Sequence, residues 1–370
     1  MEYMFLCVVL ALSSFSNSRL LCKFNTFLIF IFLSGAYSYG YDWIRYREYY
    51  EFVFSPYDYS TWLYEPGFSM ILLLTKSLSL DYQWAVALTS LILCFNIYRY
   101  SISKINVNFC LLFVFSVFGF MEFAEQIRQG VAISFVLLAV NFLINKNKGK
   151  FYLYVFYASM FHASAIICLL FAYMIKLLER KNPALKLVAF ILAGFITVWG
   201  FKILINYIDV IGINGFIATK LKGYAESDGS DSGILSSGLL LNLSVIIIAL
   251  LSIQSKSGKY YASVFFSFFV IQSKVVSIAY RFSYYGYAFI YESFEWLYNA
   301  NKGRSFNRIL MVLILLVFAF KPLINPVYRA MFDDYNSYWL GLINGLPDIN
   351  NVRMERCNTL INNGIQYCSH

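Results

Sequence analysis

Apolar stretches of roughly twenty residues recur along the whole chain, and this recurrence constrains the fold more than any other feature. An α-helix needs such a length to cross the hydrocarbon core of a bilayer. Charged residues make up only 13% of the 370 residues and hydrophobic residues 60%, whereas a soluble domain carries about 25% charged residues. The sequence therefore predicts an all-α, polytopic membrane protein with roughly 10–12 transmembrane or re-entrant helices.

The apolar stretches define the predicted membrane segments, which lie at 3–16, 24–40, 66–80, 83–100, 107–122, 129–144, 151–175, 184–208, 235–253, 260–280, 283–298 and 309–322. No soluble domain of useful size remains between them. We therefore expect a single integral membrane domain over residues 1–330 and a polar tail over residues 331–370.

Lysine and arginine residues cluster in the short loops between these segments, and the net charge is +9. This pattern is typical of orientation signals, which the positive-inside rule places in the cytoplasm, and it disfavours nucleic-acid binding. The loops at 40–65, 122–130 and 209–234 then face outward, together with the C-terminal tail.

This orientation leaves a parity problem. Segments 66–80 and 83–100 must make one net crossing between them, and segment 151–175 must enter the membrane and return. Either some stretches are re-entrant or one basic loop breaks the rule. Irregular backbone is tolerated at membrane depth only where it is buried in protein or lines a wet cavity.

Several charged or titratable residues near the membrane segments need a reason, because a charge at the centre of a membrane helix costs about 2.5–3.5 kcal/mol on insertion scales. They are Asp42, Arg45, Glu65, Glu122, Glu125, Arg128, His162 and Arg281. Four of them are predicted at or near the outer face, namely Asp42, Glu65, Arg128 and Arg281. The third and fourth acidic residues of the set, Glu122 and Glu125, would share one helical face with Arg128.

Each of these residues also has a plain interpretation. Asp42 and Glu65 fit ordinary carboxylates at a membrane boundary, and Glu122 and Glu125 fit neutralising partners of Arg128. A single His162 within an apolar run is typical of a hydrogen-bonded packing residue.

The cysteine residues indicate packing more than chemistry. Five of the seven lie in or beside apolar runs, as packing residues do: Cys7, Cys22, Cys94, Cys110 and Cys168. Cys357 and Cys368 flank a polar tail segment, so they can pair only if the tail faces an oxidising compartment. With two histidines and no Cys/His cluster, no metal site is expected.

Five short motifs follow one another along the chain. Their residues are Gly40, Asp42 and Tyr46 in G-x-D-x-x-x-Y, Glu65–Phe68 in E-P-G-F, Ile127–Ala132 in I-R-Q-G-V-A, Phe161–Ala165 in F-H-A-S-A, and Tyr280, Arg281 and Ser283–Tyr285 in Y-R-x-S-Y-Y. In this order they resemble the EpsG-like family of bacterial exopolysaccharide and O-antigen synthesis, which is grouped with the Wzy-type polymerases. The resemblance covers most of residues 1–300.

The resemblance implies a GT-C-like helical bundle in the bacterial cytoplasmic membrane with its active site facing outward, toward the periplasm. It also implies a glycosyltransferase that moves a growing glycan from undecaprenyl pyrophosphate to the free sugar end of another lipid-linked repeat unit. No cofactor is implied. The expected partners are these lipid-linked oligosaccharides, membrane lipid and a chain-length regulator.

Chemical reasoning gives the charged residues roles in such a transfer. Arginine binds phosphate oxygens in a bidentate manner, so Arg128 and Arg281 are expected to hold the pyrophosphate, with Arg45 as a third candidate. Asp42, Glu65 or His162 is the expected base for the acceptor hydroxyl. A single displacement inverts the anomeric configuration. The expected supporting residues are Glu122, Glu125, Gln129, Tyr46 and Tyr284.

Other functions use the same kinds of residues. A flippase or transporter of lipid-linked oligosaccharide also needs charges inside the membrane, although no inverted repeat is visible in the sequence. An O-antigen ligase shares the transfer chemistry. A membrane O-acyltransferase would want a histidine with an activating partner, for which His162 is the one candidate.

Overall fold

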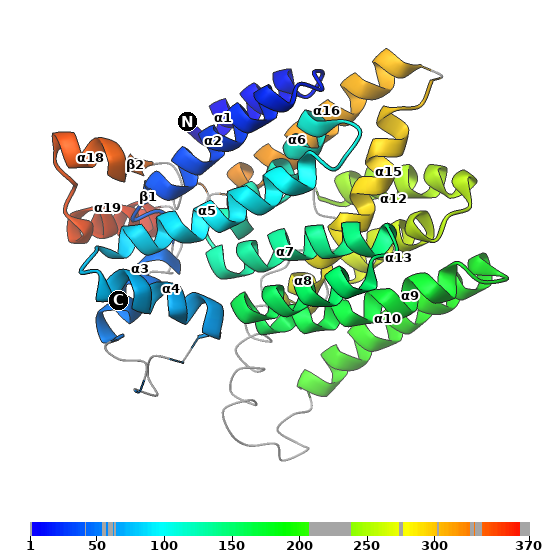
Figure 1. Ribbon diagram of the computed structural model, residues 1–370, viewed down its shortest axis with the longest axis horizontal. Coiled ribbons are helices and arrows are strands. Elements are labelled where there is room, and N and C mark those ends of the chain that lie inside the picture. The colour runs from blue at the N-terminus through cyan, green and yellow to red at the C-terminus, as the bar shows by residue number, and fades with distance from the viewer. Residues whose placement is uncertain are drawn as a thin grey trace. The chain divides into compact units, whose positions relative to one another are not determined.

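The computed structural model describes residues 2–40, 42–53, 57, 62, 64–206, 238–273, 277–301, 303–325, 329 and 335–362. Helices dominate these residues, and the strands among them are β1 (Ala36–Tyr37) and β2 (Asn336–Ser337), which pair antiparallel (Figure 1). The predicted all-α fold of a membrane protein is confirmed. The predicted outer loop at 209–234 lies outside the described residues, and so does Cys368.

The chain forms two compact units that interleave along the sequence. The first unit comprises residues 1–138, 153–163 and 309–370. Its described elements are α1 (Glu2–Ser13), α2 (Arg19–Gly35), β1, α3 (Asp42–Phe52), α4 (Pro66–Ser77), α5 (Tyr82–Ser101), α6 (Val107–Phe118), the π-helix η2 (Gly119–Phe123), most of α7 (Ile127–Ile144), the end of α8 (Lys148–Phe161), most of α16 (Arg304–Phe320), the 3₁₀-helix η6 (Lys321–Ile324), β2, α18 (Tyr338–Asn344) and α19 (Ile349–Asn362).

The second unit comprises residues 139–152 and 164–308. It holds the remaining parts of α7, α8 and α16. Its other described elements, which lie between α8 and α16 in the chain, are η3 (Ala163–Cys168), α9 (Leu169–Leu178), α10 (Pro183–Asn206), α12 (Gly238–Ser252), η4 (Ile253–Ser255), α13 (Gly258–Ser273), α14 (Ser277–Ser283), η5 (Tyr284–Gly286) and α15 (Tyr287–Tyr298). The expected division between a 1–330 domain and a 331–370 tail stays a prediction.

Helix length separates full spans from shorter pieces. Among the described residues, the helices long and apolar enough to cross a bilayer are Ile127–Ile144, Pro183–Leu204 and Arg304–Ile324. α4 has 12 residues, which makes it about 18 Å long, shorter than a hydrocarbon core of about 30 Å. The apolar run predicted at 151–175 is broken, because α8 ends at Phe161 and a 3₁₀-helix separates it from α9. Both observations fall where the sequence indicates re-entrant or incomplete crossings.

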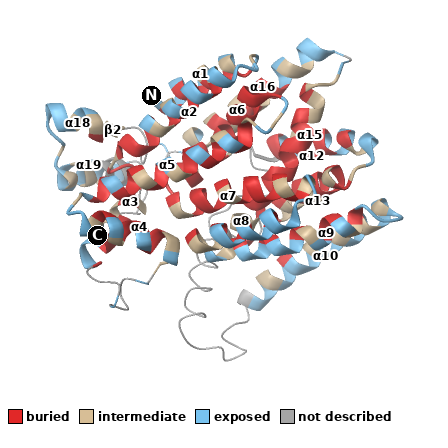
Figure 2. Cartoon of the chain, in the orientation of Figure 1, coloured by how far each residue is buried: buried red, intermediate tan, exposed pale blue. Residues whose placement is uncertain are grey.

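Burial distinguishes a helix of the interior from one that faces outward (Figure 2). α7 is buried for most of its length, whereas α10 exposes most of its apolar side chains, including Leu185 and Ile196. An apolar helix with an exposed apolar surface is what contact with lipid requires. The five cysteines expected to pack, Cys7, Cys22, Cys94, Cys110 and Cys168, are all buried, which confirms that prediction.

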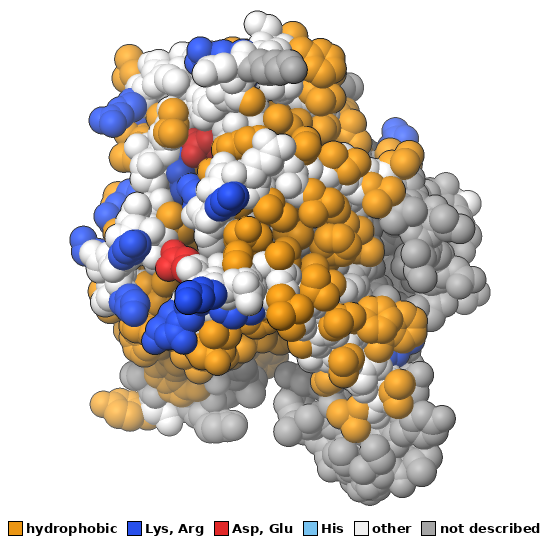
Figure 3. Space-filling model, turned by 90° about the vertical axis from the view of Figure 1, so that its right-hand side faces the viewer, with side chains coloured by type: hydrophobic (Ala, Val, Ile, Leu, Met, Phe, Trp, Pro, Cys, Tyr) orange, Lys and Arg blue, Asp and Glu red, His pale blue; other side chains and the backbone are white. Residues whose placement is uncertain are grey.

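The basic loops that follow α9, precede α13 and follow α15 lie near one another in the second unit. A Cβ atom on Gly258 would lie 2.8 Å from Cγ of Glu179, so the start of α13 adjoins the end of α9. Lys259 donates to Glu292 Oε2 at 2.6 Å, and the guanidinium carbon of Arg308 lies 4.9 Å from the ring centre of Tyr298. The positive-inside rule requires such clustering. Figure 3 shows one face of the molecule, on which Lys and Arg side chains gather beside a broad hydrophobic area.

Candidate functional site

The first part of the candidate site is the tight connection into α3. Gly40 has a φ of +78°, in the left-handed region, and a Cβ atom there would overlap Oε2 of Glu125. The backbone N–H of Asp42 donates to Glu125 Oε1 at 2.9 Å. The first N–H groups of a helix have no partner inside the helix. A buried carboxylate from a distant part of the chain therefore fixes the start of α3.

The second part is the start of α4. Glu65 is the N-cap residue in extended conformation, and Pro66 occupies the first helical turn, where its missing N–H costs nothing. A Cβ atom on Gly67 would lie 2.7 Å from the carbonyl oxygen of Met160, near the end of α8. Glu65 Oε1 accepts from the backbone N–H of Ala163 at 3.2 Å. The start of α4 and the end of α8 are thus held together.

The third part is the entry into α7. The π-helix η2 ends at Phe123, and α7 begins at Ile127. Met121 O accepts from the N–H groups of Glu125 at 3.1 Å and Gln126 at 2.7 Å. Helix η2 therefore ends in a turn, and Arg128 lies in the first turn of α7, directly after this connection between two helices.

This turn corrects one prediction. Glu122, Glu125 and Arg128 do not share a helical face, because two helices meet between them. Among the described residues, the ion pair of Arg128 is with Glu65. Glu125 Oε1 accepts from the start of α3, and neutralisation of Arg128 by Glu122 and Glu125 stays a prediction.

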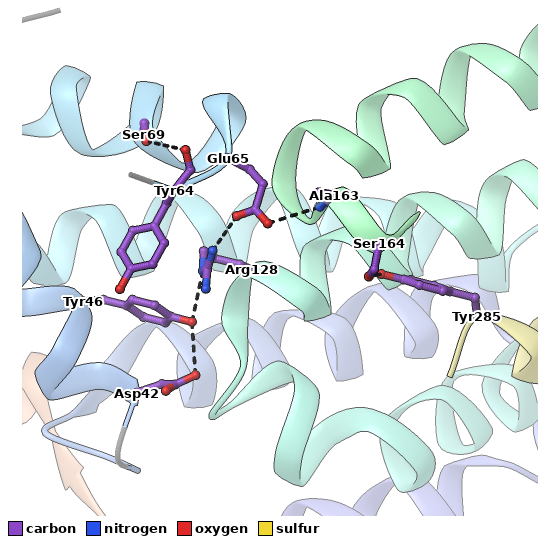
Figure 4. A network of polar contacts seen from close by, with 9 residues as sticks. All are labelled: Asp42, Tyr46, Tyr64, Glu65, Ser69, Arg128, Ala163, Ser164 and Tyr285. Atoms are coloured by element: carbon purple, nitrogen blue, oxygen red, sulfur yellow. Dashed lines mark hydrogen bonds and ion pairs between the residues drawn. The ribbon is translucent and has the colours of Figure 1, made fainter. Parts of the chain in front are cut away.

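Arg128 is the centre of a polar network that joins the three parts (Figure 4). Its Nη1 donates to Glu65 Oε2, and its Nε donates to the hydroxyl of Tyr46 at 3.1 Å. The Tyr46 hydroxyl in turn donates to Asp42 Oδ2, also at 3.1 Å. A cation is thus linked through one phenol to a carboxylate, with a second carboxylate on its other side.

Aromatic rings surround the guanidinium group. Its central carbon lies 4.1 Å from the ring centre of Tyr64, 5.1 Å from that of Tyr46 and 6.0 Å from that of Phe68. The rings of Tyr46 and Tyr64 pack edge to face, with centres 5.5 Å apart. Such cation–π contacts fix the orientation of Arg128.

The environment of Tyr46 and Tyr64 keeps both phenols protonated. Burial raises the pKa of Tyr46, and the negative charge of Asp42 raises it further, against the opposing charge of Arg128. Burial also raises the pKa of Tyr64, where the positive charges of Arg128 and Arg45 act in the opposite direction. The Tyr46 hydroxyl therefore remains a donor to Asp42 at neutral pH.

Two groups of the network have unused bonding capacity. Within the described residues, neither Nη2 of Arg128 nor Oδ1 of Asp42 makes a hydrogen bond. The Arg128 side chain is 18% exposed and that of Glu65 is 19% exposed. A guanidinium edge and a carboxylate oxygen are therefore available to a further molecule.

The other predicted residues lie around the network or apart from it. Arg45 is exposed on α3, and Gln129 is buried in α7. His162 is half-buried directly after α8, one residue before the N–H group that binds Glu65. Arg281 and Tyr284 belong to the second unit, so their convergence with Arg128 stays a prediction.

The structure adds residues that the sequence analysis passed over. Tyr64 directly precedes the E-P-G-F motif and Phe68 ends it, and both rings contact Arg128; their position beside or within the motif was the available signal. In the second unit, Ser164 Oγ and the Tyr285 hydroxyl lie 2.8 Å apart, so the F-H-A-S-A and Y-R-x-S-Y-Y motifs meet there. Among the described residues, no cluster of three or more His, Cys, Asp or Glu side chains is arranged to hold a metal ion.

The comparisons with known proteins agree with the motif pattern. A sequence model of the EpsG family matches residues 19–337, a stretch that contains every residue of the Arg128 network. No curated protein matches the chain. No solved structure matches it either.

Proposed function

Because the chain belongs to the EpsG family, we propose that it is a polysaccharide polymerase of the outer face of the bacterial cytoplasmic membrane. It transfers an undecaprenyl-pyrophosphate-linked glycan onto the sugar end of another lipid-linked repeat unit, in the synthesis of O-antigen or another exopolysaccharide. One observation carries this proposal: the available guanidinium edge of Arg128 is connected through Tyr46 to a carboxylate with an available oxygen.

Arg128 is proposed to bind the pyrophosphate that leaves. Its Nη2 atom donates no hydrogen bond to a described residue. An arginine is permanently charged, and its planar group matches the geometry of phosphate oxygens. The ring of Tyr64 and the hydroxyl of Tyr46 hold the group in one orientation before substrate arrives. Fixed charge directed at developing charge commonly supplies the largest catalytic contribution. Arg45, on α3 of the same unit, is proposed to bind the second phosphate, and the role of Arg281 stays a prediction.

Asp42 is the best candidate for the base. Both oxygens of Glu65 already accept hydrogen bonds, from Arg128 and from Ala163. Asp42 uses Oδ2 for Tyr46, while Oδ1 is available within the described residues. Glu65 is therefore better suited to orient Arg128, and His162 remains a further candidate on chemical grounds.

The proposed step is a single displacement. The acceptor hydroxyl oxygen attacks the anomeric carbon of the donor glycan and forms the new C–O bond, while the C–O bond to pyrophosphate breaks. The proton of the hydroxyl passes to Asp42, and the leaving pyrophosphate carries its negative charge against Arg128. The anomeric configuration inverts, because no covalent glycosyl intermediate forms. The step calls for no metal ion, since guanidinium groups supply the positive charge.

Deletion of the gene, followed by analysis of polysaccharide ladders, tests the proposal. A polymerase predicts loss of the ladder while one-unit product survives on the outer-face lipid carrier. One-unit product that accumulates on the inner face instead would favour a flippase and contradict the proposal.

Polysaccharide analysis of the same deletion strain also distinguishes the ligase and acyltransferase alternatives from a polymerase. A ligase defect leaves long polymer attached to the lipid carrier, and an acyltransferase defect leaves ladder length unchanged while acetyl or other acyl groups disappear. Either result would contradict polymerisation. A plasmid copy that carries the wild-type gene must restore the ladder.

A further inference from the structure

A C-terminal segment docks onto the ends of α2 and α5, beside the entry into α3. Strand β2 pairs with β1, placing Ser337 opposite Ala36. The Tyr338 hydroxyl donates to Asp81 Oδ2 at 3.1 Å, and Trp339 Nε1 donates to Ser34 Oγ, also at 3.1 Å. Helix α18 follows directly and begins where the stretch matched by the EpsG family ends.

Aromatic packing fixes the inner side of this segment. The ring of Tyr335 stacks on that of Phe32 with centres 5.0 Å apart, and its hydroxyl donates to Phe32 O at 2.7 Å. A Cβ atom on Gly35 would lie 2.9 Å from the Trp339 indole, so this close approach needs a glycine. The Trp339 and Trp84 rings meet edge to face, with centres 5.7 Å apart. The orientation of α18 on the first unit is therefore well determined by contacts.

The outer side of α18 is strongly apolar. Leu340 is 61% exposed, Leu342 is 58% exposed and Ile343 is 81% exposed. Three large aliphatic side chains exposed within four residues are unfavourable in water, since burying one such side chain fully is worth about 1.5–3 kcal/mol. Helix α19, which follows in the chain, instead has a polar sequence (INNVRMERCNTLIN). The exposed apolar side chains are thus adjacent to one another on α18, whereas on α19 Met354 and Ile361 stand seven residues apart in a polar sequence.

The surroundings of α18 indicate what covers it. The helices on which it is seated expose a series of large apolar side chains, as lipid-facing helices do: Phe27 and Ile31 on α2, and Leu91 and Phe95 on α5. Trp84 lies near the start of α5, and Trp339 of α18 packs on it beside the end of α2. Tryptophan is enriched at the membrane–water interface. The apolar surface of α18 therefore continues a lipid-facing surface at the level of its interface.

We propose that α18 lies in the interfacial region of the bilayer, with Leu340, Leu342 and Ile343 inserted among lipids and α19 left in water. This anchor is independent of the transfer chemistry. It would hold β2, and through it β1 and the connection into α3, at a fixed depth in the membrane.

Spin labels at exposed positions test this proposal. Cysteine is introduced as Ile343→Cys or, in a second variant, Leu342→Cys, with Asn351→Cys on α19 as the matched control. Each labelled full-length protein is placed in phosphatidylethanolamine–phosphatidylglycerol nanodiscs that hold one copy. Collision of the nitroxide with oxygen, which concentrates in lipid, is compared with collision with a water-soluble nickel chelate. The unsubstituted chain measures any background labelling of its own cysteines.

The labels on α18 should show several-fold more collision with oxygen relative to the nickel chelate than the label on α19. Equal accessibility to the nickel chelate at positions 342, 343 and 351 would overturn the proposal. Protection that appears only when several copies share one vesicle, and not in single-copy nanodiscs, would also overturn it, because a second copy would then be the occupant.

Discussion

A polar network of the first unit can be compared with one of the second unit, and the two differ in which parts of the helices they join. In the first unit, Arg128 binds Glu65 and Tyr46, yet its Nη2 edge is available within the described residues. In the second unit, Lys259, whose side chain is 28% exposed, binds Glu292, whose side chain is 4% exposed. Nearby, a chain of hydroxyls links Ser252, Ser293 and Ser263 at 2.7 Å each.

This difference in location indicates a ligand site in the first unit and a contact that holds helices together, here called the clamp, in the second unit. The serine chain and the Lys259–Glu292 pair join α12, α13 and α15, which is how polar side chains commonly hold membrane helices together. The Arg128 network instead sits at the first turns of α3, α4 and α7, where three short connections meet. A charge retained at such a place, with bonding capacity to spare, indicates a ligand more than a packing role.

The largest effect on polymer formation is expected when the arginine of the first network is replaced by lysine, with the reverse substitution in the second network as the control. Arg128→Lys keeps the charge but loses the planar fork, so polymer formation should fall about 100-fold or more, the range seen when one donor to developing charge is removed. The matched Lys259→Arg variant should keep its polymer, because the second network holds helices and not substrate. Ladder gels of both variants, at equal protein level in the membrane, make the measurement. Long polymer from the Arg128→Lys variant would contradict the assignment of the first network to substrate binding.

A base in the first network predicts a second large effect. Asp42→Asn preserves an acceptor for the Tyr46 hydroxyl but cannot take a proton, so the transfer rate should fall about 100-fold or more. Glu65→Gln should reduce the rate less, because Tyr46 and the aromatic rings still orient Arg128. Rates are measured with purified protein and lipid-linked repeat units. If Glu65→Gln proves the more damaging of the two, Glu65 and not Asp42 is the base.

The close approaches in the first unit predict effects on stability. Gly40→Ala forces a side chain into a left-handed backbone and against Glu125, so unfolding in detergent should become easier by about 1–3 kcal/mol. Gly149→Ala in α8 is the control, since no atom lies within 4 Å of a Cβ there. Thermal unfolding of the two variants should differ clearly in midpoint. Equal midpoints would mean that the Gly40–Glu125 contact does not secure α3.

The clamp in the second unit predicts an intermediate loss of stability with intact chemistry. Glu292→Gln leaves the partly buried Lys259 with a weaker partner, which should cost about 1–3 kcal/mol. Polymer length and linkage should stay unchanged at a temperature where the variant is folded. A variant of normal stability that makes no polymer would place Glu292 in the reaction.

The smallest effect belongs to the ion pair between Arg353 on α19 and Glu48 on α3, whose nitrogen and oxygen lie 3.6 Å apart. Both side chains are well exposed, and such pairs contribute about 0–1 kcal/mol. Arg353→Ala should therefore shift the unfolding midpoint little and leave the polymer ladder unchanged. A large loss of either would assign α19 a role in positioning α3.

Local sequence signals predicted part of this site. Pro66 after Glu65 identifies the start of α4, and the charged stretch between two apolar runs identifies the turn that carries Arg128. The division of the 151–175 run followed from a topological argument about parity. The first two features are encoded within a few residues, whereas the third needed the predicted orientation of the basic loops.

The rest of the site depends on residues far apart in the chain. α3 has a polar and aromatic sequence with no apolar stripe, and its first N–H is satisfied by Glu125, 83 residues away. Likewise Glu65 and Arg128 are 63 residues apart. Spacing along the chain cannot identify such pairs, and the helical face predicted for Glu122, Glu125 and Arg128 is absent because η2 ends at Phe123 and α7 begins at Ile127.

The most direct test of the account measures the affinity of undecaprenyl pyrophosphate, without a glycan, for the purified protein in nanodiscs. Wild-type protein and Arg128→Lys are compared, with Lys259→Arg as the control. The account predicts that Arg128→Lys weakens binding about tenfold or more, a loss of about 1.4 kcal/mol, while Lys259→Arg binds as wild type does. Unchanged affinity in Arg128→Lys would contradict the assignment of this guanidinium to the lipid pyrophosphate.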